Sequence, residues 1–200
     1  DYVVYQRAYY GEKMRKLFTS IFLICAVTAC TQFSLLEPKR TQIGDAYSVD
    51  PQIAWSKRSV GHNEIWTVDG PALQEVRFIL GVGKGDTLFA SQGLAAPENW
   101  PKLTKFQRPS EVVDFFVDSL VATKANDVQT KGLRPTKFGT NDGFRFEFSF
   151  NRNGLNFDGV GVSTTIDSEV HMVLYIATQL HYFERYRQEF EAIIKSISAV

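Results

Sequence analysis

Cysteine is nearly absent from this sequence. The chain has two cysteines, Cys25 and Cys30, and residues 31–200 contain none. For that part of the chain, the composition excludes a disulfide-stapled scaffold, a zinc site built on thiolates and a thiol nucleophile. Histidine is scarce as well, and the three in the chain are His62, His171 and His181. Because no His, Asp or Glu cluster shows the spacing that zinc requires, we expect no metal and no cofactor.

An excess of charge of one sign is also missing. Lys plus Arg and Asp plus Glu each number 22 in the whole chain. Residues 1–29 hold four of the basic and two of the acidic residues, so the remainder carries 18 against 20 and a net charge of −2. A basic face of the kind that binds phosphate backbones is therefore not indicated, and we expect no nucleic-acid partner.

Recognisable catalytic signatures are lacking too. The glycine-rich segment 81–87 does not have the spacing of a phosphate-binding P-loop and suits a hairpin turn. Ser163 does not lie in the G-x-S-x-G pattern of a nucleophile elbow. Asp142, Asp158 and Asp167 occupy turn-like positions, where aspartate commonly bonds its own backbone, and nothing marks a glycosidase pair among the carboxylates. We therefore expect no enzyme, and an unrecognised hydrolase is the third of three functional hypotheses.

The longest apolar run lies near the start of the sequence. Met14 is followed by two basic residues and by the run 17–27, which is shorter than the about 20 residues that span a bilayer. This layout predicts a secretory signal peptide. The run ends in Val27-Thr28-Ala29-Cys30, which resembles the lipobox of bacterial lipoproteins, although Val27 stands where leucine is commonest. The resemblance implies cleavage before Cys30 and attachment of diacylglycerol and a further acyl chain, such as palmitate, to Cys30.

The predicted signal divides the chain into four segments. They are an upstream or non-native segment 1–13, a lipoprotein signal peptide 14–29, a tether 30–46 and a single α+β domain 47–200. The acylated N-terminus would anchor the domain to a membrane. Thr31 replaces the aspartate that favours inner-membrane retention in enterobacteria. We therefore expect a lipid-anchored protein of the bacterial cell envelope, at the outer membrane and facing the periplasm.

Periodicity in the remaining sequence predicts strands around two helices. Residues 144–150 alternate strictly between phenylalanine and polar residues, which predicts a half-buried strand. Apolar residues at spacings of three and four predict helices at 110–124, with Ser110 as the N-cap, and at 181–198. The other predicted strands are 47–49, 53–60, 64–68, 76–82, 87–90, 128–138 with an interruption at Pro135, 155–166 and 170–177. This order predicts an α+β fold with an antiparallel sheet and two main helices.

The element order and three motifs resemble the PsbP-like fold, which a group of bacterial lipoproteins shares with an extrinsic photosystem protein. The motifs are the helix start 110–116, the strand 144–150 and the aromatic-rich ending 182–197, and the resemblance covers roughly residues 75–198. It implies a domain that binds other proteins or assists their assembly. The resemblance does not imply a catalytic residue at any position of this sequence.

Three tryptophans are the candidate interaction residues. Trp55, Trp66 and Trp100 fall near predicted loops, and Trp100 lies in a long Gly- and Pro-rich loop at 91–109. They either fill the core or line a ligand groove or partner patch. Our first hypothesis is a non-enzymatic envelope lipoprotein that docks a protein partner through this loop and a sheet face. The alternative is a binding module that holds a small apolar or amphipathic ligand between the helices and the phenylalanine-rich sheet.

Overall fold

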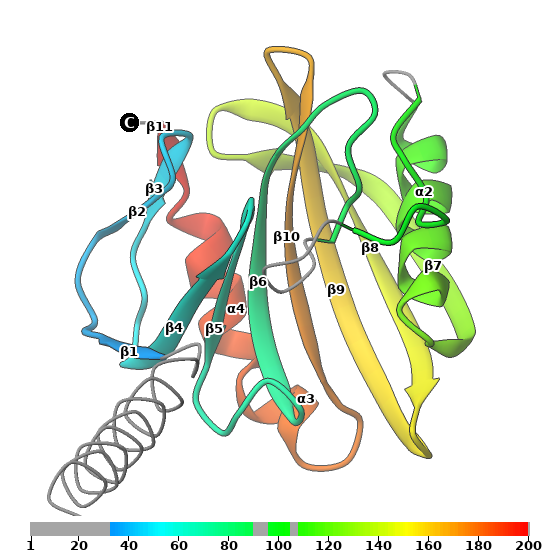
Figure 1. The fold of residues 1–200 in the computed structure, drawn as a ribbon. Coiled ribbons are helices and arrows are strands. Elements are labelled where there is room, and N and C mark those ends of the chain that lie inside the picture. The colour runs from blue at the N-terminus through cyan, green and yellow to red at the C-terminus, as the bar shows by residue number, and fades with distance from the viewer. Residues whose placement is uncertain (1–32, 90–95, 105–107, 200) are drawn as a thin grey trace, which may run out of the picture. The chain divides into compact units, whose positions relative to one another are not determined.

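An antiparallel sheet forms the framework of the protein. The computed structural model describes residues 33–89, 96–104 and 108–199, and these form an eight-stranded sheet in the order β1-β4-β5-β6-β10-β9-β8-β7 (Figure 1). In that order the strands are β1 (Ser34–Leu36), β4 (Trp55–Val60), β5 (Asn63–Thr67), β6 (Gln74–Val82), β10 (Glu169–Thr178), β9 (Leu155–Ile166), β8 (Asn141–Arg152) and β7 (Asn126–Phe138). Every neighbouring pair is antiparallel, as predicted. Compared with a balanced α+β domain, the fold is dominated by its sheet.

A small second sheet ties the two ends of the described chain together. It pairs β11 (Ser198–Ala199) with β3 (Tyr47–Val49) and β3 with β2 (Thr41–Ile43). The described part of the predicted tether therefore belongs to the fold, because it supplies β1 and β2. These strands are three residues each, too short to show an alternating pattern in sequence. The predicted signal peptide and Cys30 lie outside the described residues.

The first predicted helix is confirmed with a different start. Helix α2 (Pro109–Ala122) has Arg108 rather than Ser110 as its N-cap. Proline suits the first helical position, since its missing N–H would have no partner there and its φ is already helical. The backbone N–H of Arg108 donates to the Glu111 carboxylate at 2.8 Å, which secures the start of the helix.

The predicted C-terminal helix is divided in two. It consists of α3 (Tyr182–Arg185) and α4 (Arg187–Lys195), and the chain leaves helical geometry at Tyr186, with φ −116°. The Tyr186 ring is buried 6.2 Å from the Trp55 ring, and its hydroxyl donates to Asp69 at 2.5 Å. These tertiary contacts outweigh the helical periodicity. Among the described residues, neither these helices nor α2 has the length and apolar character to cross a bilayer.

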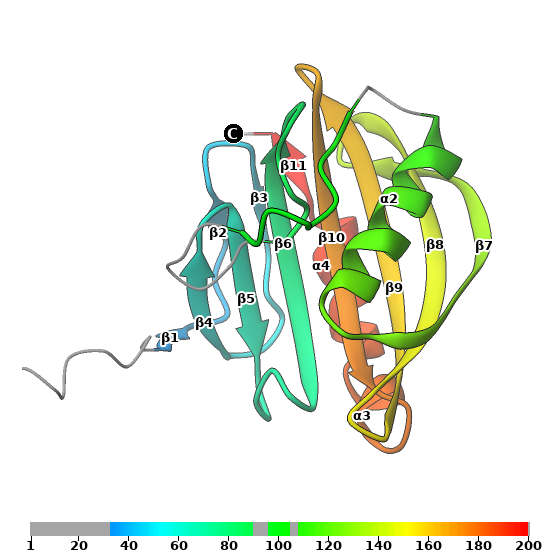
Figure 2. The ribbon, with the colours of Figure 1, turned by 45° about the vertical axis from the view of Figure 1, so that its right-hand side comes forward.

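Helices cover the two faces of the sheet. Figure 2 shows α2 on one face and α4 on the other. On the α2 face, the Phe116 ring lies 5.1 Å from Phe146 and 4.7 Å from Phe148. On the opposite face, Tyr175 stacks 5.4 Å from Phe190 of α4. Two separate hydrophobic clusters therefore hold the helices to the sheet.

The phenylalanine rows depend on glycines in the neighbouring strand. Phe148 pairs with Gly159 and Phe146 with Gly161. A Cβ atom at Gly161 would lie 2.5 Å from Cε1 of Phe146, and one at Gly159 would lie 2.7 Å from Cε1 of Phe148. Carbon atoms in contact normally keep 3.5 to 4 Å apart. The rings therefore lie flat against β9 only because both opposing residues are glycine.

Two further predictions about strands are corrected. Residues 87–89, the described part of the predicted strand 87–90, do not form a hairpin strand. The chain before them bonds to Leu103 instead: the N–H of Gly85 donates to the Leu103 carbonyl at 2.7 Å, and the N–H of Leu103 donates to the Asp86 carbonyl at 2.9 Å. Pro135 does not interrupt β7 but pairs with Phe144. An edge strand tolerates proline, since one side of its backbone has no ladder to join.

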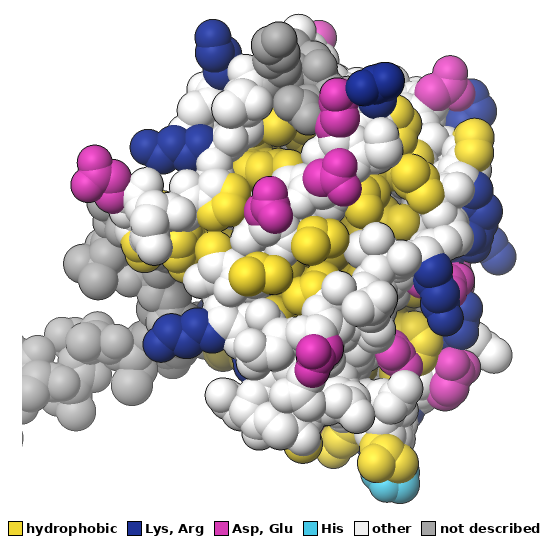
Figure 3. Space-filling view, turned by 90° about the vertical axis from the view of Figure 1, so that its right-hand side faces the viewer, with side chains coloured by type: hydrophobic (Ala, Val, Ile, Leu, Met, Phe, Trp, Pro, Cys, Tyr) yellow, Lys and Arg dark blue, Asp and Glu magenta, His cyan; other side chains and the backbone are white. Residues whose placement is uncertain are grey.

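Helix α2 leaves part of its apolar surface accessible. Figure 3 views the side of the domain that carries α2 and β7, where hydrophobic side chains are exposed between separate charged ones. The inner residues of α2, such as Phe116 and Leu120, are buried, whereas Val121 is 51 % exposed. The predicted wide apolar face is thus only partly covered by the sheet.

Candidate functional site

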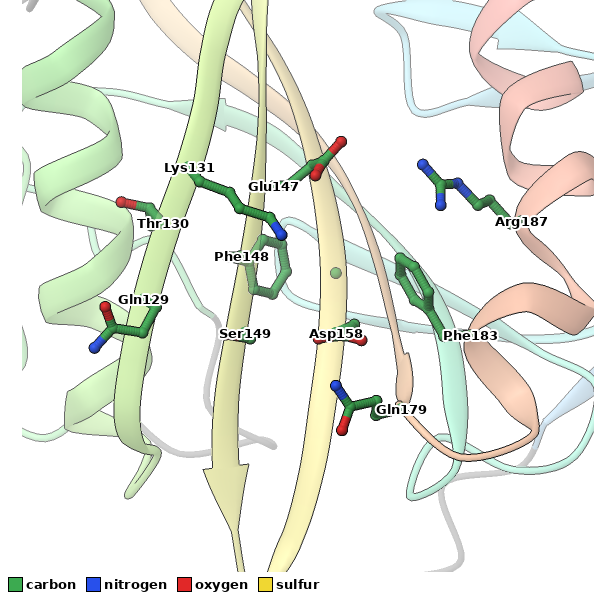
Figure 4. Close-up of a pocket in the computed structure, with 11 residues that line it drawn as sticks. Gln129, Thr130, Lys131, Glu147, Phe148, Ser149, Asp158, Gln179, Phe183 and Arg187 are labelled. Atoms are coloured by element: carbon green, nitrogen blue, oxygen red, sulfur yellow. The ribbon is translucent and has the colours of Figure 1, made fainter.

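A groove of about 460 Å³ lies between the outer strands of the sheet and helices α3 and α4. We call it the charged groove. Strands β7, β8 and β9 form one side, and Phe183 and Arg187 come from the helices opposite (Figure 4). Its lining residues are Gln129, Thr130, Lys131, Glu147, Phe148, Ser149, Asp158, Gly159, Gln179, Phe183 and Arg187.

Strand alternation places the polar side chains of the groove. In β8 the phenylalanines point to the α2 face, so Glu147 and Ser149 point to the other. The register sets Lys131 opposite Glu147 and Asp158 opposite Ser149. Side chains directly across an antiparallel pair have Cβ atoms about 5 Å apart. Three neighbouring strands therefore present a continuous polar surface.

Both signs of charge meet in this groove. Figure 4 shows the Glu147 carboxylate and the Arg187 guanidinium extending into it from opposite sides. Arg187 contacts Glu184 at 3.2 Å, and its guanidinium carbon lies 5.4 Å from the Phe183 ring centroid. Glu147 lies 4.0 Å from Arg134. Ion pairs this exposed contribute only about 0–1 kcal/mol, so the groove can exchange them for contacts with a ligand at little cost.

A half-buried ion pair beside the groove fixes its width. Nη1 of Arg145 in β8 donates to Glu191 of α4 at 2.7 Å, and Nη2 donates to the second carboxylate oxygen. This hydrogen bonding raises the pKa of Arg145 and lowers the pKa of Glu191, while burial opposes both shifts. A bidentate pair is strong and directional. It holds α4 at a set distance from the strand that supplies Glu147.

Two of the three predicted tryptophans are core residues. Trp55 is 1 % exposed and Trp66 is fully buried, with their rings 6.3 Å apart. The indole N–H of Trp66 donates to Glu64 at 2.7 Å. This corrects their interpretation as surface interaction residues. Trp100 is partly buried against the cluster under α2 and lies outside the charged groove.

The other polar residues considered from sequence are also placed. Asp158 lies within β9 and lines the groove, and Asp142 lies in β8, so neither is in a turn; Asp167 does lie in the β9–β10 turn. Ser163 is buried and donates to the His171 carbonyl at 2.9 Å, and burial lowers the pKa of His171. Within the ranges the structure describes, no three His, Cys, Asp or Glu side chains gather as a metal site would require.

The groove residues were not singled out from the sequence. Lys131, Glu147 and Arg187 look like ordinary solvent-facing positions of a strand or helix. The one available signal was the strict alternation of 144–150, which sets its polar residues on one face. Which other strands share that face depends on the register, and the sequence alone does not supply it.

Comparison with known proteins leaves the family open. No family model and no curated protein matches the chain. Among solved structures, LpqN, involved in cell envelope biogenesis of Mycobacterium tuberculosis, is 11 % identical with a TM-score of 0.36, over 86 % of each chain. Cyanobacterial PsbP (CyanoP) from Synechocystis sp. PCC 6803 is 10 % identical with a TM-score of 0.47, over 87 % of this chain and 96 % of that one. Both scores are below 0.5, so neither similarity decides fold family or function.

Proposed function

We propose that this protein is a membrane-anchored lipoprotein of the bacterial cell envelope and acts as a non-enzymatic protein-interaction module. Its charged groove receives a polar segment of a partner protein that carries both acidic and basic side chains. The observation that supports this role is the placement of Lys131, Glu147 and Arg187 around one open groove on rigid elements. Charges of both signs favour a partner with the complementary pattern and reject others.

Cys30 provides the anchor in this proposal. Strand β1 starts at Ser34, four residues after Cys30. A chain of four residues spans at most about 14 Å, so lipid on Cys30 would keep the domain close to the bilayer surface. Mass spectrometry of protein extracted from its own membranes tests this: we expect a chain beginning at Cys30 plus acyl groups. An unmodified longer chain would end the lipoprotein proposal.

Pairing of a partner strand with β7 is a less suitable mode than binding in the groove. Strand β7 is the long exposed edge of the sheet, but its register shifts at two places, and it contains Pro135 and exposed lysines. Bulges, proline and lysine are the devices by which edge strands resist pairing with another chain. The partner is therefore proposed to contact side chains in the groove rather than to extend the sheet.

The packing of α2 gives little support to the apolar-ligand alternative. That hypothesis needs space between a helix and the phenylalanine face. Phe116 occupies this position, with its ring 5.1 Å from Phe146 and 4.7 Å from Phe148. A ligand there would have to displace a fully buried side chain.

Charge reversal in the groove tests the interaction role. The full chain is purified under mild detergent from its own membranes, as wild type, as Glu147→Lys and as the matched control Asp118→Lys on the exposed face of α2. We expect one protein to copurify with wild type and control, and its affinity for Glu147→Lys to fall about tenfold or more, since like charges across an interface are costly. Equal recovery with all three chains would contradict the proposed role of the groove.

A further inference from the structure

A second recess lies on the opposite face of the sheet, beside the C-terminal end of α2. It has a volume of about 210 Å³ and we call it the arginine recess. Its lining residues are Glu75, Arg77, Phe89, Leu120, Thr123, Arg152 and Ile176. Glu75 pairs with Ile176 and Arg77 with Leu174 across β6 and β10, which places them on the face that α2 covers. The recess is thus separate from the charged groove.

Arg77 is held in place by Glu75. Its Nε donates to Glu75 Oε1 at 2.9 Å, and its Nη2 lies 2.8 Å from the same oxygen. The side chains of Arg77 and Glu75 are only 20 % and 7 % exposed. The guanidinium carbon of Arg77 lies 5.2 Å from the Phe89 ring centroid. The single carboxylate of the recess is therefore engaged by one arginine.

None of the ion pairs among the described residues involves Arg152. Its Nη2 donates to the Thr123 hydroxyl at 2.7 Å, and its guanidinium carbon lies 5.0 Å from the Phe150 ring centroid. Its Nε is buried, and no group in the described ranges accepts a hydrogen bond from it. Burial lowers the pKa of Arg152 and the charge of Arg77 lowers it further, although Glu75 opposes the shift.

The recess therefore holds two cations and one anion between apolar walls. A partly buried charge without a counter-ion is costly. The Phe150 ring compensates the Arg152 charge only in part, and the aliphatic side chains of Leu120 and Ile176 offer it no compensation. Among the described residues that line the recess, Glu75 is the single carboxylate. An external anion would balance this excess positive charge.

We propose that the arginine recess is a binding site for an oxyanion group, the phosphate or carboxylate of a small molecule or lipid headgroup. Two guanidinium groups present planar arrays of N–H donors, the arrangement that best matches carboxylate and phosphate oxygens. Thr123 orients Arg152, and the Arg77–Glu75 pair sets the second donor. Glu75 limits the affinity for the oxyanion, because it already accepts from Nε and Nη2 of Arg77.

Titration with inorganic phosphate tests the proposal. The full chain, labelled at arginine nitrogen and held in detergent, is followed through its arginine Nε–Hε resonances while phosphate replaces chloride at constant ionic strength. We expect saturable shifts of Arg152 and Arg77. Arg152→Gln weakens binding by about tenfold or more, the usual size for a hydrogen bond to a charged group, and Glu75→Gln strengthens it. The matched control is Arg108→Gln, which removes an exposed arginine paired with one glutamate at the other end of α2.

Further measurements distinguish a folding defect from a loss of binding, and a lipid headgroup from a free anion. Arg152→Lys keeps the charge but loses the planar donors. This variant should therefore fold normally and bind phosphate several-fold more weakly than wild type. Vesicles of phosphatidylglycerol and of phosphatidylcholine are added in place of phosphate; shifts with phosphatidylglycerol alone identify a lipid headgroup, and shifts with phosphate identify a free anion. Linear, unsaturable shifts with every probe, or equal affinities of wild type and Arg152→Gln, would overturn the proposal.

Discussion

Replacing Gly161 by alanine is a direct test of how the sheet is packed. The added Cβ would lie 2.5 Å from Cε1 of Phe146, about 1 Å inside normal carbon contact. The ring has little room to retreat, because Phe116 of α2 lies 5.1 Å from it on the other side. Overpacking of this kind costs about 1–3 kcal/mol. For a domain of this size we expect the melting temperature to fall by about 3–10 °C.

Calorimetry and a double-mutant cycle measure this effect. We expect Gly161→Ala to lower the free energy of unfolding less in the Phe146→Leu background than in wild type, because the smaller side chain leaves room for the methyl group. A coupling of about 0.5 kcal/mol or more would agree with direct contact between the two residues. If Gly161→Ala leaves the melting temperature unchanged, or if the two substitutions are additive, the account of the glycine-facing phenylalanines is wrong.

The remaining predictions concern the ion pair beside the groove and the tryptophans. Because the pKa of Glu191 is lowered in the fold, the pair contributes stability above its ordinary pKa of 4.5 and loses it as the pH falls through the folded value. Urea unfolding should therefore show Arg145→Met to be less stable than wild type at pH 7, with a gap that narrows below about pH 4.5; a gap independent of pH would contradict this. In the same assay, Trp66→Ala should lower the free energy of unfolding by about 3–5 kcal/mol, as for a fully buried aromatic residue. A small loss would contradict the assignment of Trp66 to the core. Trp100→Ala should cost clearly less than Trp66→Ala, because Trp100 is only partly buried.

The sequence predicted the elements whose local pattern and tertiary role agree. The strand 144–150 lies within β8 and alternates because its phenylalanines meet α2, whereas its polar side chains face the charged groove and α4. The antiparallel sheet was predicted from the order of the elements, in which runs of strands are set off by single helices. The helix start at Pro109 was missed by one residue, since proline and Ser110 both suit a helix N-terminus.

Other features depend on contacts between distant residues. β1 and β2 are short, and only their pairing with β4 and β3 identifies them. The break at Tyr186 follows from its bond to Asp69, 117 residues earlier. The charged groove needs the register of three strands and the position of α4. Trp55 and Trp66 were assigned near loops, but their rings point into the core between the sheet and Tyr186.

The most direct test of the groove as the docking site is crosslinking inside intact cells. A photoreactive amino acid is placed at Gln129, which lines the charged groove, and separately at Asp118, which is exposed on the opposite face. We expect a covalent adduct with one envelope protein from Gln129 only, and its loss when Glu147→Lys is added. Adducts of equal yield from both positions, or an adduct from Gln129 that persists with Glu147→Lys, would contradict the account.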